Sequence, residues 1–154
     1  MDRNNKPIKR HTALKNLSRE HHDILIFGLR LKKGINKKAD LYSINKYINW
    51  FWETYLNKHF NFEENELFAR FNFLDHTEKA REFHLTIKKL IFEDFLSKDQ
   101  IVELYGLIEK HIRFEERILF NEIQEISTEE QLEAFSKIHQ EQLKCAFWPE
   151  QFWK

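Results

Sequence analysis

A histidine and a glutamate recur at the same spacing in two segments of the chain. Ten-residue segments that begin at His59 and at His111 share His, Phe, Glu, Glu, Leu and Phe at the same offsets, and each opens with His-x-x-x-Glu. Residues four apart lie on one face of a helix, about one turn from each other, so the two side chains can converge on one metal ion. The repeat therefore predicts two metal-ligating pairs, His59 with Glu63 and His111 with Glu115.

Both pairs lie in apolar stripes. The apolar residues at helical spacing around them are Trp52, Tyr55 and Leu67 for the first pair, and Leu104, Ile108 and Leu119 for the second. A carboxylate buried in such a stripe is costly unless it is paired or bound to a metal. The alternative is that both pairs are exposed and make only weak contacts within their own helix. The agreement between the repeat and the stripes favours buried pairs that bind metal.

Four long helices are expected to position these pairs. Apolar residues at a helical period predict helices over about 11–33 and 41–71, a third that opens at Asp75, and a fourth that runs to about residue 126. Gly34 is expected to end the first helix as its C′ residue. Capping boxes are expected to open the third, fourth and a shorter fifth helix, at Asp75 with Glu78, Ser97 with Gln100, and Ser127 with Glu130.

Short links between four long helices predict an all-α fold, an antiparallel up-down-up-down four-helix bundle with a short fifth C-terminal helix. The 154 residues suit a single domain, with the bundle over about 11–126 and a C-terminal helix and aromatic tail over 127–154. Only 3 glycines and 2 prolines are present, too few for the turns of an all-β fold. The aromatic tail is expected to cap the bundle or, less simply, to cover a partner surface.

Composition excludes several classes of partner. The 25 basic and 25 acidic residues cancel and are interspersed, so binding to nucleic acid or to an anionic membrane is not expected. The one cysteine, Cys145, cannot form an internal disulfide, and no apolar segment follows the polar start of the chain, so a cytoplasmic protein is predicted. Cys145 lies outside the repeat and is expected to be a small apolar filler rather than a ligand.

A centre inside four helices needs ligands from the first and third helices as well. His84 lies on the apolar face of the third helix, with Ile87 and Ile91. Counting residues from the loops places His21, His59, His84 and His111 within one layer of the bundle, so a site shared by four helices is geometrically reasonable.

Two histidines compete in the first helix. His21 shares a stripe with Leu17 and Ile24, whereas alignment of Arg19-Glu20-His21-His22 with Arg81-Glu82-Phe83-His84 would make His22 the ligand. Helix phase favours His21, and His22 stays open as the alternative. The other histidines, His11, His76 and His139, are expected to be ordinary surface residues.

These residues resemble the hemerythrin-like family, also called the HHE cation-binding domain. The segment Leu17-Ser18-Arg19-Glu20-His21 is similar to the family's opening Leu-x-x-Glu/Asp-His, and both His-x-x-x-Glu copies run on into Glu-x-x-Leu-Phe, like its hallmark. The resemblance covers about residues 11–126 and implies two iron ions in an Fe–O–Fe type centre inside a four-helix bundle. Imidazole and carboxylate donors without thiolate suit iron or manganese, and zinc fits less well.

The resemblance also implies roles for individual residues. His21, His59, His84 and His111 would be terminal ligands, and Glu63 and Glu115 would bridge the two irons. Oxygen-carrying members have a further histidine where this chain has Ala80, and a bridging aspartate where it has Glu116. These departures favour the four-His, two-Glu variety, which is similar to proteins implicated in iron-cluster repair, nitric-oxide chemistry and iron or oxygen sensing.

Tyr55 lies one turn before His59 on the same face. Its hydroxyl is expected either to reach a ligand or a vacancy at the centre, or to be satisfied elsewhere in a packed core. The leading interpretation is a non-haem di-iron protein that binds or reacts with dioxygen, nitric oxide or peroxide. The alternative is an iron- or oxygen-dependent sensor whose metal occupancy controls a surface that a redox or regulatory protein reads. A helical bundle with a vestigial site comes last, because it would bury polar side chains without a metal.

Overall fold

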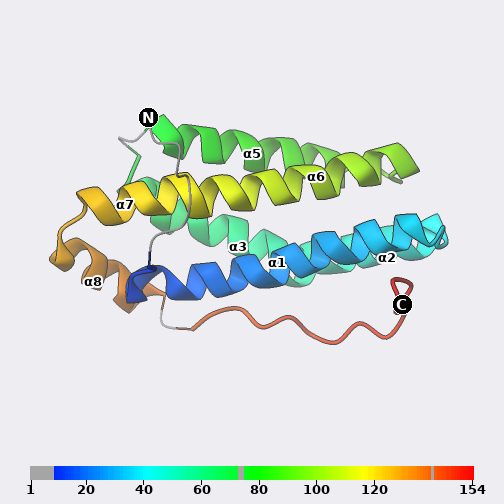
Figure 1. Ribbon diagram of the computed structural model, residues 1–154, viewed down its shortest axis with the longest axis horizontal. Coiled ribbons are helices and arrows are strands. Elements are labelled where there is room, and N and C mark those ends of the chain that lie inside the picture. Colours follow the sequence, from blue (N-terminus) through cyan, green and yellow to red (C-terminus); the bar gives the residue numbers. More distant parts are fainter. Residues whose placement is uncertain (1–8, 73–74, 140) are drawn as a thin grey trace.

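Four helical columns run antiparallel along the long axis of the molecule (Figure 1). The structure is a computed structural model and describes residues 9–72, 75–139 and 141–154. The first column is α1 (Thr12–Asn36), the third is α5 (Asp75–Ile91), and the short helix α8 (Glu129–Ile138) follows the fourth. No strand occurs in the described residues, so the predicted all-α bundle with a short fifth C-terminal helix is confirmed.

The second and fourth columns contain π-helical turns. The second comprises α2 (Leu41–Phe51), η1 (Trp52–Leu56), α3 (Asn57–Phe62), η2 (Glu63–Leu67) and α4 (Phe68–Arg70), and the fourth comprises α6 (Lys98–Phe114), η3 (Glu115–Leu119) and α7 (Phe120–Ile126). The Phe68 amide donates to the carbonyl of Glu63, five residues earlier, and the Phe120 amide donates to Glu115 in the same way. Two π turns therefore begin at the glutamates of the repeat, as is frequent at functional sites.

The predicted helix starts are correct in one case and displaced in two. Ser97 and Gln100 form both bonds of a capping box at the start of α6. The fifth helix is capped one residue later than predicted, by Thr128 with Gln131, because Ser127 is used to end α7. Asp75 is the first residue inside α5 and not the cap before it, and the cap position itself lies outside the described residues.

Gly34 was predicted to end the first helix, but it lies inside α1. The helix continues to Asn36, and Lys38 adopts the left-handed conformation after it, with φ 57°. The glycine is needed for a close approach, because a Cβ at this position would lie 2.6 Å from the ring of Phe152. The end of the chain thus packs on the side of α1.

The C-terminal segment 141–154 runs in extended form beside α1 and α2 (Figure 1). Trp153 is buried, with the guanidinium of Arg30 4.3 Å above its ring, and Trp148 packs against Trp50 at 4.9 Å between ring centroids. The aromatic tail therefore covers the side of the bundle and adds Trp153 to one of its apolar clusters, in agreement with the expectation that the tail caps the bundle.

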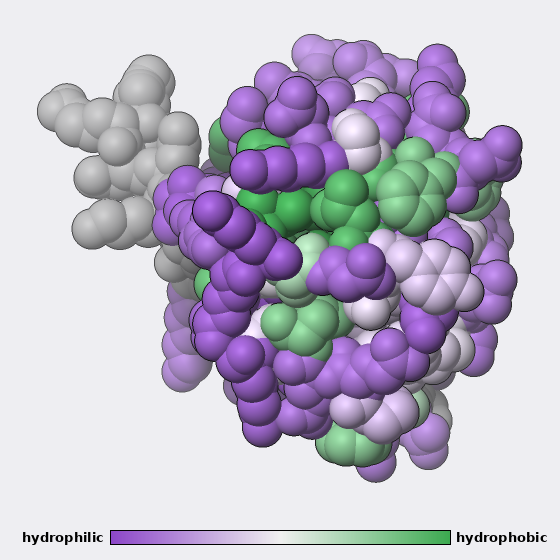
Figure 2. All heavy atoms as spheres, turned by 90° about the vertical axis from the view of Figure 1, so that its right-hand side faces the viewer, coloured by the Kyte–Doolittle hydropathy of each residue, from purple (hydrophilic) through white to green (hydrophobic). Residues whose placement is uncertain are grey.

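The end of the bundle where α1 passes into α2 and α5 into α6 presents apolar side chains at its centre, surrounded by hydrophilic ones (Figures 1 and 2). Two phenylalanines of the α5–α6 connection, Phe92 and Phe95, are among the exposed large hydrophobic residues. Among the described residues, no helix is both long enough and apolar enough to cross a membrane.

The predicted site lies between two separate apolar clusters of the core. In α1, Leu17 belongs to one cluster and Ile24 to the other, and the buried His21 lies between them. The same order occurs in α5 around His84. The bundle therefore contains a polar layer that apolar packing encloses from both ends.

Replacing Gly34 by alanine is expected to displace Phe152 and loosen the C-terminal segment. The matched control is Gly106→Ala in α6, where an added Cβ meets no atom within 4 Å, and where loss of chain freedom should stabilise the fold by about 0.4–1 kcal/mol. Relative to this control, overpacking in G34A should lower the free energy of unfolding by about 1–3 kcal/mol, measured by urea denaturation. Equal stability of the two variants would contradict the packing role of Gly34.

Candidate metal centre

Six buried side chains from all four columns converge in the polar layer. The elements that carry them are α1, α3, η2, α5, α6 and η3, and the residues are His21, His59, Glu63, His84, His111 and Glu115. Each of the six is at most 1 % exposed, so bulk water does not solvate them. The structure thus brings together every residue that the sequence analysis assigned to a metal.

The six residues form two overlapping groups, each with ligand atoms within 4.8 Å of one another. One group contains His21 and His59, and the other contains His84 and His111. Glu63 and Glu115 belong to both groups. Two shared carboxylates between two pairs of imidazoles are the arrangement that two bridged metal ions require.

The Nε2 atoms of the histidines face the shared carboxylates. His21 Nε2 lies 3.2 Å from Glu63 and 3.0 Å from Glu115, and His84 Nε2 lies 3.0 Å and 3.2 Å from the same two residues. His111 Nε2 lies 2.7 Å from Glu115. A lone pair on each Nε2 facing a carboxylate oxygen at these distances is repulsive unless a cation lies between them.

In three of the four histidines, the outer ring nitrogen, Nδ1, which faces away from Glu63 and Glu115, is hydrogen-bonded to a further carboxylate. His21 Nδ1 lies 2.6 Å from Glu116, and His84 Nδ1 lies 2.7 Å from Glu64. His59 Nδ1 lies 2.7 Å from Glu20. An ionised carboxylate accepts a hydrogen bond from Nδ1–H, which keeps the proton on Nδ1 and leaves Nε2 as a metal donor.

The three outer carboxylates are held in their charged form. Burial opposes the charge of Glu20, but hydrogen bonds from His139, His59 and the Leu143 amide lower its pKa to about 2. For Glu64 and Glu116, burial is likewise outweighed by hydrogen bonds from the histidines that they hold, so the pKa of each is lowered. All three are therefore ionised at neutral pH and can accept a hydrogen bond from an imidazole N–H.

The inner carboxylates impose a demand for positive charge. Burial by itself would lower the pKa of His84, but its hydrogen bonds to Glu115, Glu63 and Glu64 raise the pKa to about 10. Protons or metal ions can supply this charge. A metal ion fits better, because His59 Nε2, Glu63 Oε1 and Glu115 Oε1 are buried without a well-formed hydrogen bond to any described residue.

Aromatic rings close the layer around the imidazoles. Phe60 stacks on His84 with ring centroids 3.8 Å apart, and Phe120 stacks on His21 at 5.2 Å. These rings hold the imidazole planes and exclude water from the carboxylates, so interactions within the layer are strengthened.

His21, and not His22, lies in the centre. His22 is exposed, one residue along the same helix. Helix phase was therefore the better guide, and the alignment that paired His22 with His84 is wrong by one residue. In the structure, His21 corresponds to His84, and Glu20 corresponds to Phe83.

Tyr55 does not direct its hydroxyl into the centre. The hydroxyl donates to Asp23 at 2.8 Å and lies 3.5 Å from the carbonyl of Leu143. Burial and the bond to Asp23 raise its pKa. The expectation that Tyr55 reaches a bound ligand or a vacancy is thus corrected, because α1 and the C-terminal segment satisfy the hydroxyl.

His139 is not the surface residue that was predicted. It is buried at the C-terminal end of α8, and its Nε2 lies 3.0 Å from Glu20. Glu20 also accepts the amide of Leu143 at 2.8 Å. The C-terminal segment is therefore joined to the residue that holds His59, a contact without any sequence signal.

The remaining histidines and the cysteine lie away from the centre. His11 caps α1 and contacts Glu129, and His76 contacts Glu122. Cys145 is exposed, so its predicted role as an apolar filler is wrong.

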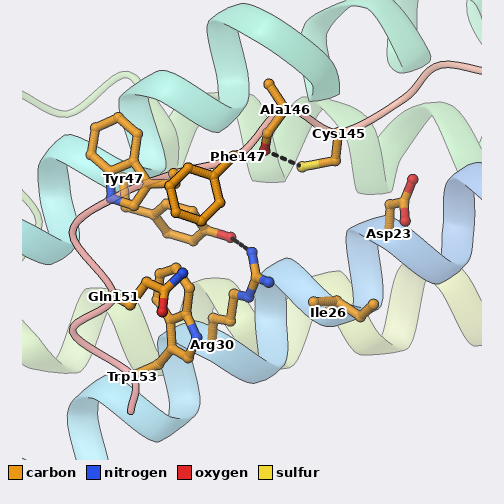
Figure 3. A pocket seen from close by; sticks show the side chains of 10 residues that line it. Asp23, Ile26, Arg30, Tyr47, Cys145, Ala146, Phe147, Gln151 and Trp153 are labelled. Atoms are coloured by element: carbon orange, nitrogen blue, oxygen red, sulfur yellow. Dashed lines mark hydrogen bonds between the residues drawn. The ribbon is translucent and has the colours of Figure 1, made fainter.

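Cys145 lies at a pocket of about 320 Å³ between the C-terminal segment and α1 and α2 (Figure 3). In it, Arg30 donates to the Tyr47 hydroxyl at 3.2 Å. None of the six converging residues lines this pocket.

The sequence of the bundle matches a known family. The family model of the hemerythrin HHE cation-binding domain matches residues 12–121. The chain belongs to this family. No curated protein and no solved structure matches the chain. The matched region contains all six converging residues and excludes α8 and the C-terminal segment, so the hemerythrin-like bundle carries the metal-binding groups.

Both inner glutamates are expected to be required for metal binding. Replacing Glu63 or Glu115 by alanine should lower bound metal well below two ions per chain, because each carboxylate serves both groups. The controls are Glu66→Ala and Glu109→Ala, which remove a partly exposed and an exposed carboxylate, respectively, from the same columns. Metal content after purification is the measurement. Full metal content in both inner variants would refute the bridging roles.

The two adjacent histidines of α1 offer a second test. His21→Ala should reduce bound metal, whereas His22→Ala should leave it unchanged, because only His21 faces the inner carboxylates. The comparison uses metal analysis and the optical spectrum of the loaded protein. Metal loss in H22A with full retention in H21A would reverse the assignment.

Proposed function

We propose that this hemerythrin-like protein is a non-haem di-iron protein that binds or reacts with a small molecule, either a diatomic ligand (dioxygen or nitric oxide) or peroxide. The observation that carries the proposal is the pair of groups that share Glu63 and Glu115. The donor set contains imidazole and carboxylate but no thiolate, which suits iron better than structural zinc. Manganese and zinc are the substitute metals for the same residues.

Each residue has a defined part in this proposal. His21 and His59 would bind one iron, His84 and His111 the other, and the shared carboxylates would bridge them. The outer carboxylates orient the imidazoles, and the aromatic rings exclude water. Two iron ions held in this way would supply redox chemistry and coordination of a small ligand.

The protein offers fewer donors than two octahedral ions need. Two histidines and two shared carboxylates give each ion four protein ligands, short of six. Ala80, one turn before His84, is fully buried, and its methyl group cannot coordinate a metal. The Tyr55 hydroxyl donates a hydrogen bond to Asp23, so it does not supply a further metal ligand either. Open positions for an external ligand follow.

A sensor is the second candidate, and a specific contact favours it. Glu20 accepts hydrogen bonds from His59 of the centre and from His139 and the Leu143 amide of the C-terminal region. A change in the position of His59 when metal binds would therefore reach the C-terminal segment. In this reading a redox or regulatory protein partner recognises that segment, and the protein acts in the cytoplasm.

Nitric oxide tests the open positions directly. The reduced, anaerobic, iron-loaded protein should bind nitric oxide at both irons, because four protein ligands leave open coordination positions on each ion. Dioxygen should oxidise it quickly, without a long-lived oxygenated state. Nitric oxide titration with optical and electron paramagnetic resonance detection measures the stoichiometry. No nitric oxide binding by the fully loaded protein would contradict the open positions. A stable, reversible dioxygen adduct would contradict the expected rapid oxidation and would indicate binding of dioxygen in place of reaction with it.

A further inference from the structure

The centre has an approximate twofold internal symmetry. The outer nitrogen of His21 in α1 is held by Glu116 of the fourth column, and that of His84 in α5 is held by Glu64 of the second. Glu64 and Glu116 occupy equivalent positions in the ten-residue repeat. The first and third columns are thus equivalent, and so are the second and fourth.

One outer contact breaks this symmetry. Glu20, the residue before His21, holds His59 Nδ1 at 2.7 Å. The residue before His84 is Phe83, whose ring centroid lies 6.1 Å from that of His111. A phenylalanine therefore stands where the other half of the centre has a carboxylate.

As a result, the outer nitrogen of His111 has no hydrogen-bond partner in the part of the chain that the structure describes. His111 Nδ1 is fully buried and makes no hydrogen bond with any described residue. Two phenylalanine rings pack near this imidazole, since Phe60 meets it edge-on at 5.4 Å between ring centroids and Phe83 lies at 6.1 Å. Of the four converging imidazoles, His111 alone lacks a carboxylate on Nδ1 in the described part of the chain.

Phe83 also separates His111 from the surface. A hollow of about 220 Å³ between α5 and α6 is lined by Lys79, Glu82, Phe83, Thr86 and Leu107. Phe83 contacts both this hollow and the imidazole. The hollow beside this position thus has space for a different side chain, and its lining carries both an ammonium, from Lys79, and a carboxylate, from Glu82.

A carboxylate on the outer nitrogen makes an imidazole a stronger and better oriented metal donor. Loss of such a partner typically costs about 10–100-fold in metal affinity. Both histidines of the first group have this partner, whereas only His84 of the second group does.

We infer that Phe83 makes the two metal positions unequal, so that the ion held by His21 and His59 is bound more tightly than the ion held by His84 and His111. The difference in affinity should be about 10–100-fold. This inference rests on the proposed two-metal centre. It adds a residue, Phe83, that binds no metal itself but leaves His111 a weaker metal donor than the other three histidines.

A difference between two affinities would not by itself identify Phe83. Because both ions share Glu63 and Glu115, the second ion to bind meets carboxylates whose charge is already partly neutralised. This sharing weakens the second ion at either position. The test must therefore show which position is the weaker one and that residue 83 controls it.

The experiment removes metal stepwise from the cobalt(II)-loaded full-length protein with a chelator, following the visible spectrum and the metal content. Wild-type protein should release two ions in separate steps. His111→Ala should lack the weak step and keep the tight one, and His59→Ala should lose the tight one. Phe83→Glu should strengthen the weak step toward the tight one, and Glu20→Gln should weaken the tight one.

The matched control is Leu85→Glu, which adds a carboxylate to an exposed position of the same helix and should leave both steps unchanged. A readout on wild-type protein keeps the inference testable if F83E does not fold. With one equivalent of zinc(II), nitrogen NMR of the imidazoles should show His21 and His59 shifted first.

The outcomes separate the inference from the proposed function. Fewer than two cobalt ions in the loaded wild-type protein would overturn the two-metal centre. Two ions with equal release, loss of the tight step in H111A, unchanged steps in a folded F83E, or first occupation of His84 and His111 by zinc would overturn the role of Phe83 and leave the two-metal centre intact.

Discussion

The structure depends on the burial of two negative charges. Glu63 and Glu115 are fully buried in the middle of a small bundle, between two apolar clusters that cannot solvate them. Two such carboxylates are stable only where cations or hydrogen-bond donors surround them. Each of the four columns must therefore place a histidine at this one level, and this requirement fixes the register of every helix in the bundle.

The same requirement explains the arrangement of consecutive glutamates. In each copy of the repeat, the first glutamate faces the centre and the second holds an imidazole of a neighbouring column. A π turn begins at the inner glutamate of both copies, and its extra residue changes the direction of the side chains that follow. Of two adjacent glutamates, the first thus faces the centre and the second accepts a hydrogen bond from an imidazole Nδ1. The second glutamate fixes the tautomer in which Nε2 is free to bind a metal.

Much of this could be predicted from sequence, for a physical reason. A buried carboxylate and a helical stripe leave regular patterns, so the bundle, the two His-x-x-x-Glu pairs and the choice of His21 by helix phase follow from periodicity. The π turns, the outer role of Glu20 and the burial of His139 do not, because they depend on contacts between residues far apart in the chain. The start of the fifth helix was misplaced by one residue, since Ser127 and Thr128 offer the same capping chemistry and only the end of α7 decides between them.

The asymmetry of the centre has a structural cause in the C-terminal segment. Glu20 is a buried carboxylate, and it is stable because it has three donors: His59, His139 and the Leu143 amide. Two of the three come from residues that follow the bundle. On the opposite side, the hollow beside Phe83 is lined by residues of α5 and α6, and the C-terminal segment contributes no donor to that lining. A buried carboxylate with few donors is costly, whereas a buried phenylalanine is not. The donors from the end of α8 and the C-terminal segment therefore explain why the third outer carboxylate, Glu20, lies on the His59 side of the centre and not on the His111 side.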